Sequence, residues 1–182
     1  MIQFRTHGIT KDPEKMKHNE GGWYYEMQHL GYNYRITDFQ CALGISQFKK
    51  LDKFIDIRRN IVNRYNEAFR NLKEITIPFE KSDVKSVYHL YMIQLNPEKL
   101  NVGRRQIFDA LRAENIGVHV HYIPVHLMPY YQEHFGYKKG DFPIAEKFYE
   151  RALTLPLFPK MGKNDVNDVI DAVEKVIKHF RK

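Results

Sequence analysis

The chain has one cysteine, ten glycines and eight prolines in 182 residues, and it contains no apolar run near the roughly 20 residues that cross a bilayer. Cys41 alone cannot form an internal disulfide, which agrees with a reducing compartment. The low glycine and proline content excludes a collagen-like or linker-like chain, and the first ten residues show no signal-peptide apolar region. We therefore expect a globular, cytoplasmic chain with no membrane segment.

Three common catalytic motifs are also missing. The sequence has no G-x-x-x-x-G-K-[ST] phosphate loop, no G-x-G-x-x-G fingerprint and no G-x-S-x-G turn. The usual nucleotide-hydrolase and serine-hydrolase functions are excluded on this ground.

Basic residues are in excess, with 29 lysines and arginines against 22 acidic residues and a net charge of +7. Most of the excess lies in residues 49–73, where eight basic side chains face three acidic ones, a local charge of +5. Such a segment can attract nucleic acid, anionic lipid or a phosphorylated molecule. It can equally be the solvated face of a helix, because the charges occupy the positions that an apolar stripe leaves free.

The apolar spacing in the first half of the chain predicts one long helix. It starts at Thr37 and Asp38 and runs for about three dozen residues to Leu72, so at 1.5 Å per residue it must bend near Gly44 or connect two lobes. Before it, residues 1–9 resemble the end of a helix, residues 11–22 a polar loop and residues 23–30 a strand.

The second half predicts a small α/β sandwich with a three-stranded sheet. Its strands are expected at residues 75–78, 88–95 and 118–122. A helix capped by Asn101 and ended by Gly117 precedes the third strand, and two later helices are expected to start at Asp141 and Asn164.

Histidines gather near the end of the predicted third strand. His119 and His121 lie two residues apart and share one face of a strand, and His126 follows them. They could meet a metal ion, but no carboxylate or thiolate stands nearby to complete a ligand set, so we predict no metal. His121, at a strand end before a proline-rich turn, is the best candidate for a functional histidine.

A second candidate site is the run Gly-Tyr-Asn-Tyr-Arg at residues 31–35, just before the long helix. Asn33 supplies a neutral donor and Arg35 a charged fork, and a helix N-terminus favours an anion, so a phosphate is the natural partner. The alternative is that Asn33 only stabilises a turn and that Arg35 pairs with a carboxylate.

Several ordered motifs resemble one family, the pyridoxal-phosphate-dependent sugar aminotransferases of the DegT/DnrJ/EryC1/StrS group. The motifs are R-T-H-G-I at 5–9, L-G-Y-N-Y-R-I-T-D-F-Q-C-A-L-G at 30–44, Q-F-K-K-L-D at 47–52, G-V-H-V-H-Y-I-P-V-H at 117–126 and L-P-L-F-P at 155–159. The run at 23–35 and H-L-Y at 89–91 are most similar to the pseudaminic-acid branch.

The resemblance implies a homodimeric enzyme that uses pyridoxal phosphate and glutamate to aminate C4 of a UDP-linked 4-keto-6-deoxy N-acetyl sugar. Asn33 matches an asparagine that reaches the cofactor phosphate of the neighbouring subunit. His121 matches a histidine of the substrate pocket, and Arg35 is a further candidate for substrate binding. These roles imply neither nucleic acid nor membrane as a partner.

The family's catalytic lysine is not among the matched motifs. It stands in an S-x-H-x-x-K context, and no lysine here has that setting, so no Schiff-base lysine is assigned. We expect the C-terminal half of an aspartate-aminotransferase-like fold. Residues 1–44 would be a large-domain segment with dimer surface and residues 45–182 the small α/β domain, inactive on its own.

Two other functions remain open. The charge of residues 49–73 would suit a nucleic-acid or anionic-partner binding module, which salt should weaken steeply. The histidines would suit a metal protein, which elemental analysis would detect. Neither explains the ordered motifs.

Overall fold

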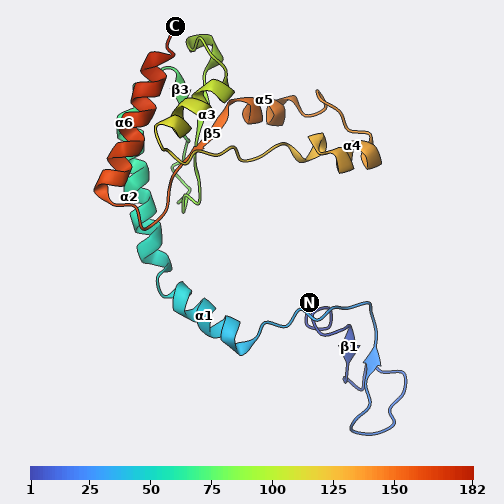
Figure 1. Cartoon of the computed structure of the whole chain (residues 1–182). Coiled ribbons are helices and arrows are strands. Elements are labelled where there is room, and N and C mark those ends of the chain that lie inside the picture. Colours follow the sequence, from blue (N-terminus) through green and yellow to red (C-terminus); the bar gives the residue numbers. More distant parts are fainter. The chain divides into compact units, whose positions relative to one another are not determined.

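The computed structural model describes all 182 residues, which form two compact units, Met1–Leu51 and Asp52–Lys182 (Figure 1). The boundary lies at the start of the second helix. The assignment of residues 1–44 to a large domain and 45–182 to a small one stays a prediction. No helix is long and apolar enough to cross a membrane.

The first unit is built on short antiparallel pairings. Strand β1 (Ile9–Thr10) pairs with β2 (Glu26–Met27), and Thr6 forms a bridge with Asn33. The prediction that residues 1–9 end a helix is wrong, because the backbone turns through left-handed conformations at His7 and Gly8, with φ of 57° and 70°. A Cβ on Gly8 would lie 1.7 Å from the carbonyl oxygen of His29, so this close approach requires glycine.

Helix α1 (Asp38–Phe48) begins where the sequence predicts it. Thr37 caps it, accepting from the backbone N–H of Gln40, and the Gln40 side chain accepts from the Thr37 N–H in return. Of the two alternatives for the long helix, the bend near Gly44 is wrong, and the chain instead divides into two units at Leu51. The helix continues through Gly44 and ends at Phe48, and α2 (Leu51–Phe69) follows.

The two helices differ in what they bury. Helix α1 buries no residue, whereas α2 places four side chains in the core of the second unit, namely Ile61, Val62, Tyr65 and Phe69. The single apolar stripe predicted from the sequence is therefore divided between two helices. The stripe on α2 packs into the core, and the stripe on α1 is not buried.

The second unit contains a three-stranded antiparallel sheet in the order β3-β4-β5, formed by β3 (Ile75–Thr76), β4 (Tyr91–Leu95) and β5 (Ala152–Leu155). The number of strands is confirmed, but the third strand is not the predicted one. Residues 118–122 contribute only one bridge, His119 to Thr154. All four residues of β5 are buried and pair with β4, which gives this segment more partners than residues 118–122 have.

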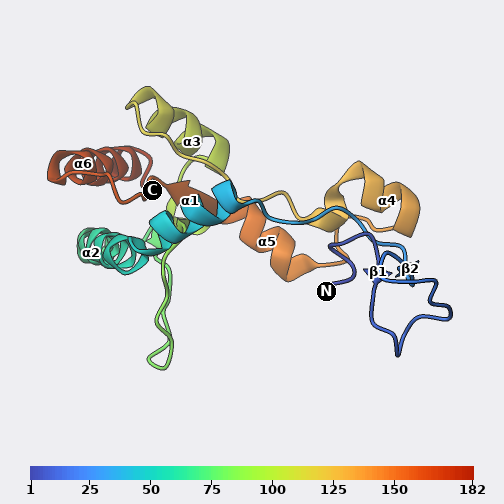
Figure 2. The same cartoon turned by 90° about the horizontal axis from the view of Figure 1, so that it is seen from below.

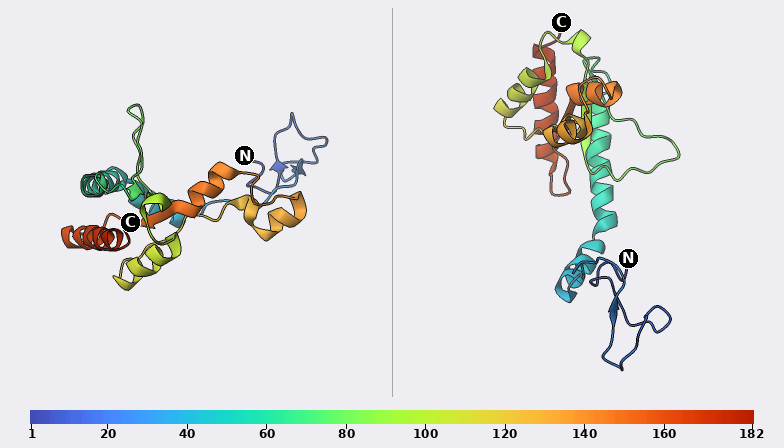
Figure 3. Two further views of the ribbon diagram at one scale, coloured as in Figure 1. Left: turned by 90° about the horizontal axis from the view of Figure 1, so that it is seen from above. Right: turned by 90° about the vertical axis from the view of Figure 1, so that its right-hand side faces the viewer.

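Six further helical segments complete the second unit: η1 (Pro97–Lys99), α3 (Arg104–Ala113), η2 (Val125–Leu127), α4 (Pro129–Phe135), α5 (Pro143–Arg151) and α6 (Lys163–His179). Figures 2 and 3 show α2 and α6 side by side. Their apolar faces, with those of α3 and the sheet, enclose one core that includes Ile93, Ile107, Leu153 and Val173.

The predicted helix caps in this unit are wrong by one or two residues. Gly103, Phe142 and Gly162 occupy the N-cap positions of α3, α5 and α6 in place of Asn101, Asp141 and Asn164. Helix α3 ends at Ala113 before a left-handed Asn115, so Gly117 does not end it. Asparagine, like glycine, adopts this left-handed conformation readily, so Asn115 could also have been predicted to follow the end of the helix.

Candidate functional site

Asn33 lies on a backbone-paired segment of the first unit. The N–H of Tyr32 donates to the carbonyl of Phe4 at 2.8 Å, the N–H of His7 to that of Tyr32 at 2.9 Å, and the N–H of Tyr34 to that of Arg5 at 3.0 Å. The rings of Tyr32 and Tyr34 stack 5.1 Å apart. Main-chain bonds and ring packing thus hold the segment without help from the Asn33 amide.

The side chains of Asn33 and Arg35 are exposed and have no intramolecular hydrogen bond or ion pair. The structure therefore does not support the alternative hypothesis for these residues. Within this chain the Asn33 amide does not stabilise a turn, and the Arg35 guanidinium does not pair with a carboxylate. Within three residues, the segment exposes one neutral donor, the Asn33 amide, and one charged donor, the Arg35 guanidinium. This donor set fits a phosphate.

His121 lies in the second unit, beside the sheet. Its Nδ1 is 2.8 Å from the hydroxyl oxygen of Thr154 on β5. Its ring stacks on that of His119 at 4.7 Å between centroids, and meets the ring of Tyr122 edge-on at 4.6 Å. The prediction that His119 and His121 share a face is confirmed.

His121 also borders an open pocket of about 680 Å³ whose other lining is mostly apolar and aromatic. Tyr122, Phe142, Phe148 and Tyr149 contribute rings to it. Partial burial, and after it the neighbouring imidazoles of His119 and His89, lowers the pKa of His121 and so favours the neutral ring. A neutral imidazole beside aromatic walls can donate or accept one directional bond to a polar ligand.

His126 does not join the other two histidines. Its Nε2 lies 2.9 Å from Oε1 of Glu146 in a buried pair, and its ring packs on Phe142. No group of three His, Cys, Asp or Glu side chains comes together in a way that could hold a metal ion. The His126 side chain thus connects η2 to α5 through its contact with Glu146.

Sequence reasoning missed Glu146. Its carboxylate also accepts from the backbone N–H groups of Gly140 and Phe142, so it holds the loop that leads into α5. An acidic residue in the first turn of a helix, three positions after a proline, was the only local signal. Its histidine partner is 20 residues away in sequence.

Three of the eight basic side chains of residues 49–73 make contacts inside the fold. Arg58 donates to the carbonyls of His89 and Leu157, and Arg59 forms an ion pair with Glu80 at 2.8 Å. Arg64 donates to the side chain of Asn167 at 2.5 Å. These arginines tie α2 to the rest of the unit and are not a free cationic face.

Sequence comparison matches residues 1–174 to one family model, described as the DegT/DnrJ/EryC1/StrS aminotransferase family. The chain belongs to this family. Sugar aminotransferases are therefore its relatives, and the resemblance read from the motifs at 5–9, 30–44 and 117–126 is confirmed.

Two curated relatives illustrate the match. The spore coat polysaccharide biosynthesis protein SpsC of Bacillus subtilis is 43% identical over 94% of this chain and 44% of its own length. The UDP-4-amino-4,6-dideoxy-N-acetyl-beta-L-altrosamine transaminase of Campylobacter jejuni is 34% identical over 98% of this chain and 44% of its own length. The chain spans less than half the length of these relatives.

Solved structures agree with the family assignment. Helicobacter pylori PseC, an aminotransferase of pseudaminic acid biosynthesis, superimposes with a TM-score of 0.84 at 26% identity, covering 98% of this chain and 45% of PseC. The PMP form of the Streptococcus pneumoniae sugar aminotransferase Spr1654 gives 0.84 at 29% identity, over 98% and 44%. The fold is therefore part of a fold type I sugar aminotransferase.

Proposed function

We propose that this chain forms the C-terminal part of a pyridoxal-phosphate-dependent enzyme that aminates C4 of a nucleotide-linked 4-keto-6-deoxy sugar with glutamate as donor. The observation that carries the proposal is the pair of free donors on Asn33 and Arg35, within a chain whose family consists of sugar aminotransferases. The named activities of the Campylobacter and Helicobacter relatives support the choice of sugar.

The residues present fit one end of the cofactor. The Asn33 amide would donate to the cofactor phosphate in the partner subunit of a homodimer, and Arg35, two residues further along, would meet a phosphate of the nucleotide. When bound, the cofactor supplies an aldehyde that accepts an amino group and passes it on. We assign the lysine that anchors the cofactor to the part of the enzyme that corresponds to the unaligned part of the relatives.

His121 would act on the sugar side. The Thr154 hydroxyl fixes its ring, which leaves Nε2 for a hydrogen bond to substrate, and the aromatic side chains of the adjoining open pocket would contact the apolar parts of the substrate. The chain's own contribution is thus to bind and orient, with no bond-making residue among its assigned positions.

A basic binding module is the second candidate, and the structure gives it little support. Arg58, Arg59 and Arg64 make intramolecular contacts, so fewer cations remain for a polyanion than the sequence count suggests. If the module were correct, binding to nucleic acid would fall steeply with salt and would ignore changes at Asn33.

A chimaera tests the proposed function. This chain is joined to the segment of the Campylobacter jejuni transaminase that it does not match, and the product is supplied with ¹⁵N-glutamate and the UDP-linked 4-keto sugar. We expect ¹⁵N at C4 of the sugar. The control is the Campylobacter transaminase with its own C-terminal part in place of this chain. If this control transfers the label and a folded, cofactor-loaded chimaera does not, the proposal is overturned.

A further inference from the structure

An open groove lies in the second unit, between the end of α3, the loop that follows β5 and the first part of α6. Its volume is about 490 Å³, and it shares no lining residue with the pocket beside His121. The lining residues lie within three stretches, 114–117, 156–161 and 165–175. Three stretches of the second unit thus form one concave surface, which we call the α3–α6 groove.

The base of the α3–α6 groove is apolar. Four of its apolar side chains are less than one tenth exposed, namely Ile116, Met161, Val169 and Ala172. Phe158 lines the same space and is 48% exposed. A half-exposed ring beside buried apolar side chains forms a surface that an apolar group of a ligand can cover.

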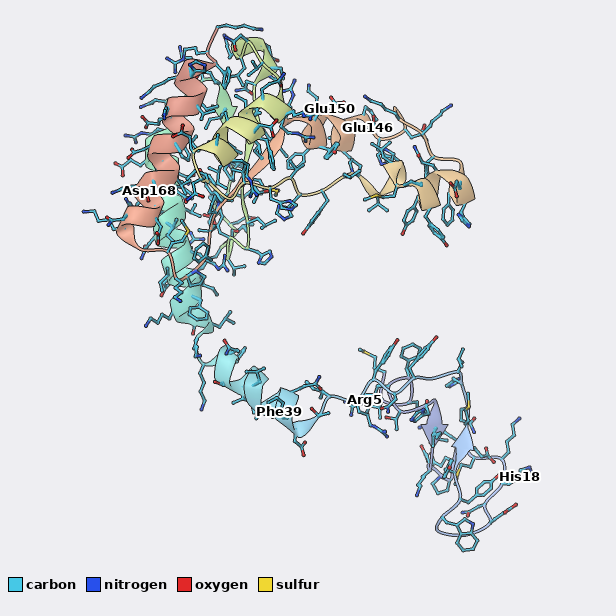
Figure 4. The ribbon with its side chains drawn as sticks, in the orientation of Figure 1. Arg5, His18, Phe39, Glu146, Glu150 and Asp168 are labelled. Carbon is cyan, nitrogen blue, oxygen red and sulfur yellow. The ribbon has the colours of Figure 1, made fainter.

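Carboxylates surround this apolar base. Asp165, Asp168 and Asp171 recur every three residues along α6, on which Figure 4 labels Asp168. Glu114 lies after the end of α3, and Lys175 pairs with it at 2.7 Å. Four carboxylates and one ammonium give the lining a charge of −3, whereas the whole chain carries +7. The groove is therefore an acidic depression on a basic chain, and it attracts cations.

Two of these carboxylates are free to bind a ligand. Asp165 accepts from the backbone N–H of Gly162 at 2.7 Å and so caps α6. Asp168 and Asp171 are exposed and make no hydrogen bond or ion pair within the chain. No three of the carboxylates come together in a way that could hold a metal ion. Their separation suits several cationic groups carried by one longer ligand.

We propose that the α3–α6 groove is a docking site for a basic segment of a partner protein, in which lysine or arginine side chains flank an apolar one. The cationic groups would pair with Asp168 and Asp171, and their apolar stems would lie along Phe158. The apolar side chain of the segment would cover Ile116 and Val169. Charge complementarity selects this partner, because the negative lining repels nucleic acid and acidic peptides. This binding goes beyond amino transfer and does not rest on it.

A labelled peptide tests the docking site on the 182-residue chain by fluorescence anisotropy. The probe has the sequence Lys-Leu-Arg-Phe-Lys, and the control peptide Glu-Leu-Glu-Phe-Glu keeps the apolar residues. Only the basic peptide should bind, and its affinity should fall several-fold between about 50 and 300 mM salt, because salt screens exposed ion pairs. Methyl NMR should show shifts at Ile116, Met161 and Val169 but not at the exposed Ile144. Absent binding, or binding without these methyl shifts, would overturn the proposal.

A matched pair of double variants separates the groove from general charge. Asp168→Asn with Asp171→Asn should weaken binding of the basic peptide about fivefold, because two exposed ion pairs are lost. Asp83→Asn with Glu133→Gln removes the same charge from exposed positions outside the groove and should leave the affinity unchanged. Equal losses in the two double variants would overturn the docking site.

The chimaera and light scattering distinguish a partner protein from other occupants of the groove. The peptide should bind the chimaera as tightly as the chain alone, and the Asp168→Asn, Asp171→Asn variant should keep the mass of the wild-type chain. Binding that is lost in a folded chimaera would assign the groove to the rest of the enzyme. A lower mass in the variant would assign it to a second copy. Either result would overturn the proposal, whereas peptide binding to a chimaera that transfers no ¹⁵N would refute the proposed function alone.

Discussion

The Nε2 of His126 lies 2.9 Å from Oε1 of Glu146, and each side chain is only 8% exposed. This pair closes the segment between η2 and α5, on which one wall of the pocket beside His121 is built. Figure 4 labels Glu146 together with Glu150, which lies on the same helix. Glu150 is exposed and reaches only Lys139, at 3.3 Å.

The first prediction compares these two glutamates. Glu146→Gln should lower the melting temperature by several degrees, because the buried imidazole and the backbone N–H groups of Gly140 and Phe142 lose a charged acceptor. Glu150→Gln should change it by little. Thermal unfolding followed by circular dichroism measures both. Equal shifts would mean that the buried pair contributes nothing specific.

The second prediction is that the His126–Glu146 pair makes the stability of the fold sensitive to acid. The bond to His126, ahead of the backbone N–H groups of Gly140 and Phe142, holds the pKa of Glu146 below its ordinary value. Its contribution to stability is therefore present above the unfolded-state pKa and is lost as the pH falls through the lower, folded-state pKa. Below about pH 4, wild type should lose stability more steeply than Glu146→Gln. Parallel stability curves for the two proteins would contradict this.

The loop between β3 and β4, the green excursion in Figure 3, is fastened by Glu80. Its carboxylate pairs with Arg59 and accepts from the N–H of Ser86 at 2.6 Å, and these contacts lower the pKa of Glu80 to about 2. Glu80→Gln should speed hydrogen exchange at the Ser86 amide several-fold at neutral pH. Glu98→Gln, at an exposed pair with Arg151, is the control. Unchanged exchange at Ser86 would show that the loop closes without the ion pair.

Helix α1 leaves large apolar side chains uncovered, with Phe39 83% and Phe48 75% exposed. Exposed aromatic residues at 23–34 add to this surface. Exposed large apolar side chains of this kind tend to be covered by another polypeptide, so the chain alone should form dimers or larger species. Light scattering should show a mass above the monomer's, and Phe39→Ser with Phe48→Ser should lower it. A monomer at high concentration would contradict this prediction.

Asn33→Ala tests the phosphate contact in the chimaera. Removing a hydrogen bond to a charged acceptor costs about 1.5 to 3 kcal/mol, so the cofactor affinity should fall roughly 10- to 150-fold. Because the contact is proposed to cross the dimer, cofactor should also stabilise the variant dimer less. Cofactor titration at several protein concentrations measures both effects, with Asn164→Ala as the exposed control. Equal affinities would reduce Asn33 to a structural residue of its segment.

The sequence predicted what depends on nearby residues. Thr37 and Gln40 satisfy each other's backbone across one turn, so the start of α1 is visible in four letters. The motifs around Asn33 and His121 identified the family, because several short runs in fixed order are specific together.

Features set by distant partners were missed or misplaced. Ala152 continues the apolar spacing of α5, and only its pairing with Gln94 of β4 shows that it starts a strand. The break between α1 and α2 lies in a run of good helix formers, and no local signal separates the two. The buried His126–Glu146 pair joins residues 20 positions apart, which no local pattern specifies.

The central claim is that this chain contributes binding residues and that the lysine which anchors the cofactor lies elsewhere in the enzyme. Locating the lysine to which the cofactor is attached tests this claim. Pyridoxal phosphate is added to the 182-residue chain and to the chimaera, each is treated with borohydride, and the modified lysine is identified by peptide mass spectrometry. We predict a stoichiometric adduct in the chimaera, on a lysine outside the present sequence, and none that survives dialysis on the chain alone. A stoichiometric, borohydride-fixed adduct on one lysine of this chain would contradict the account.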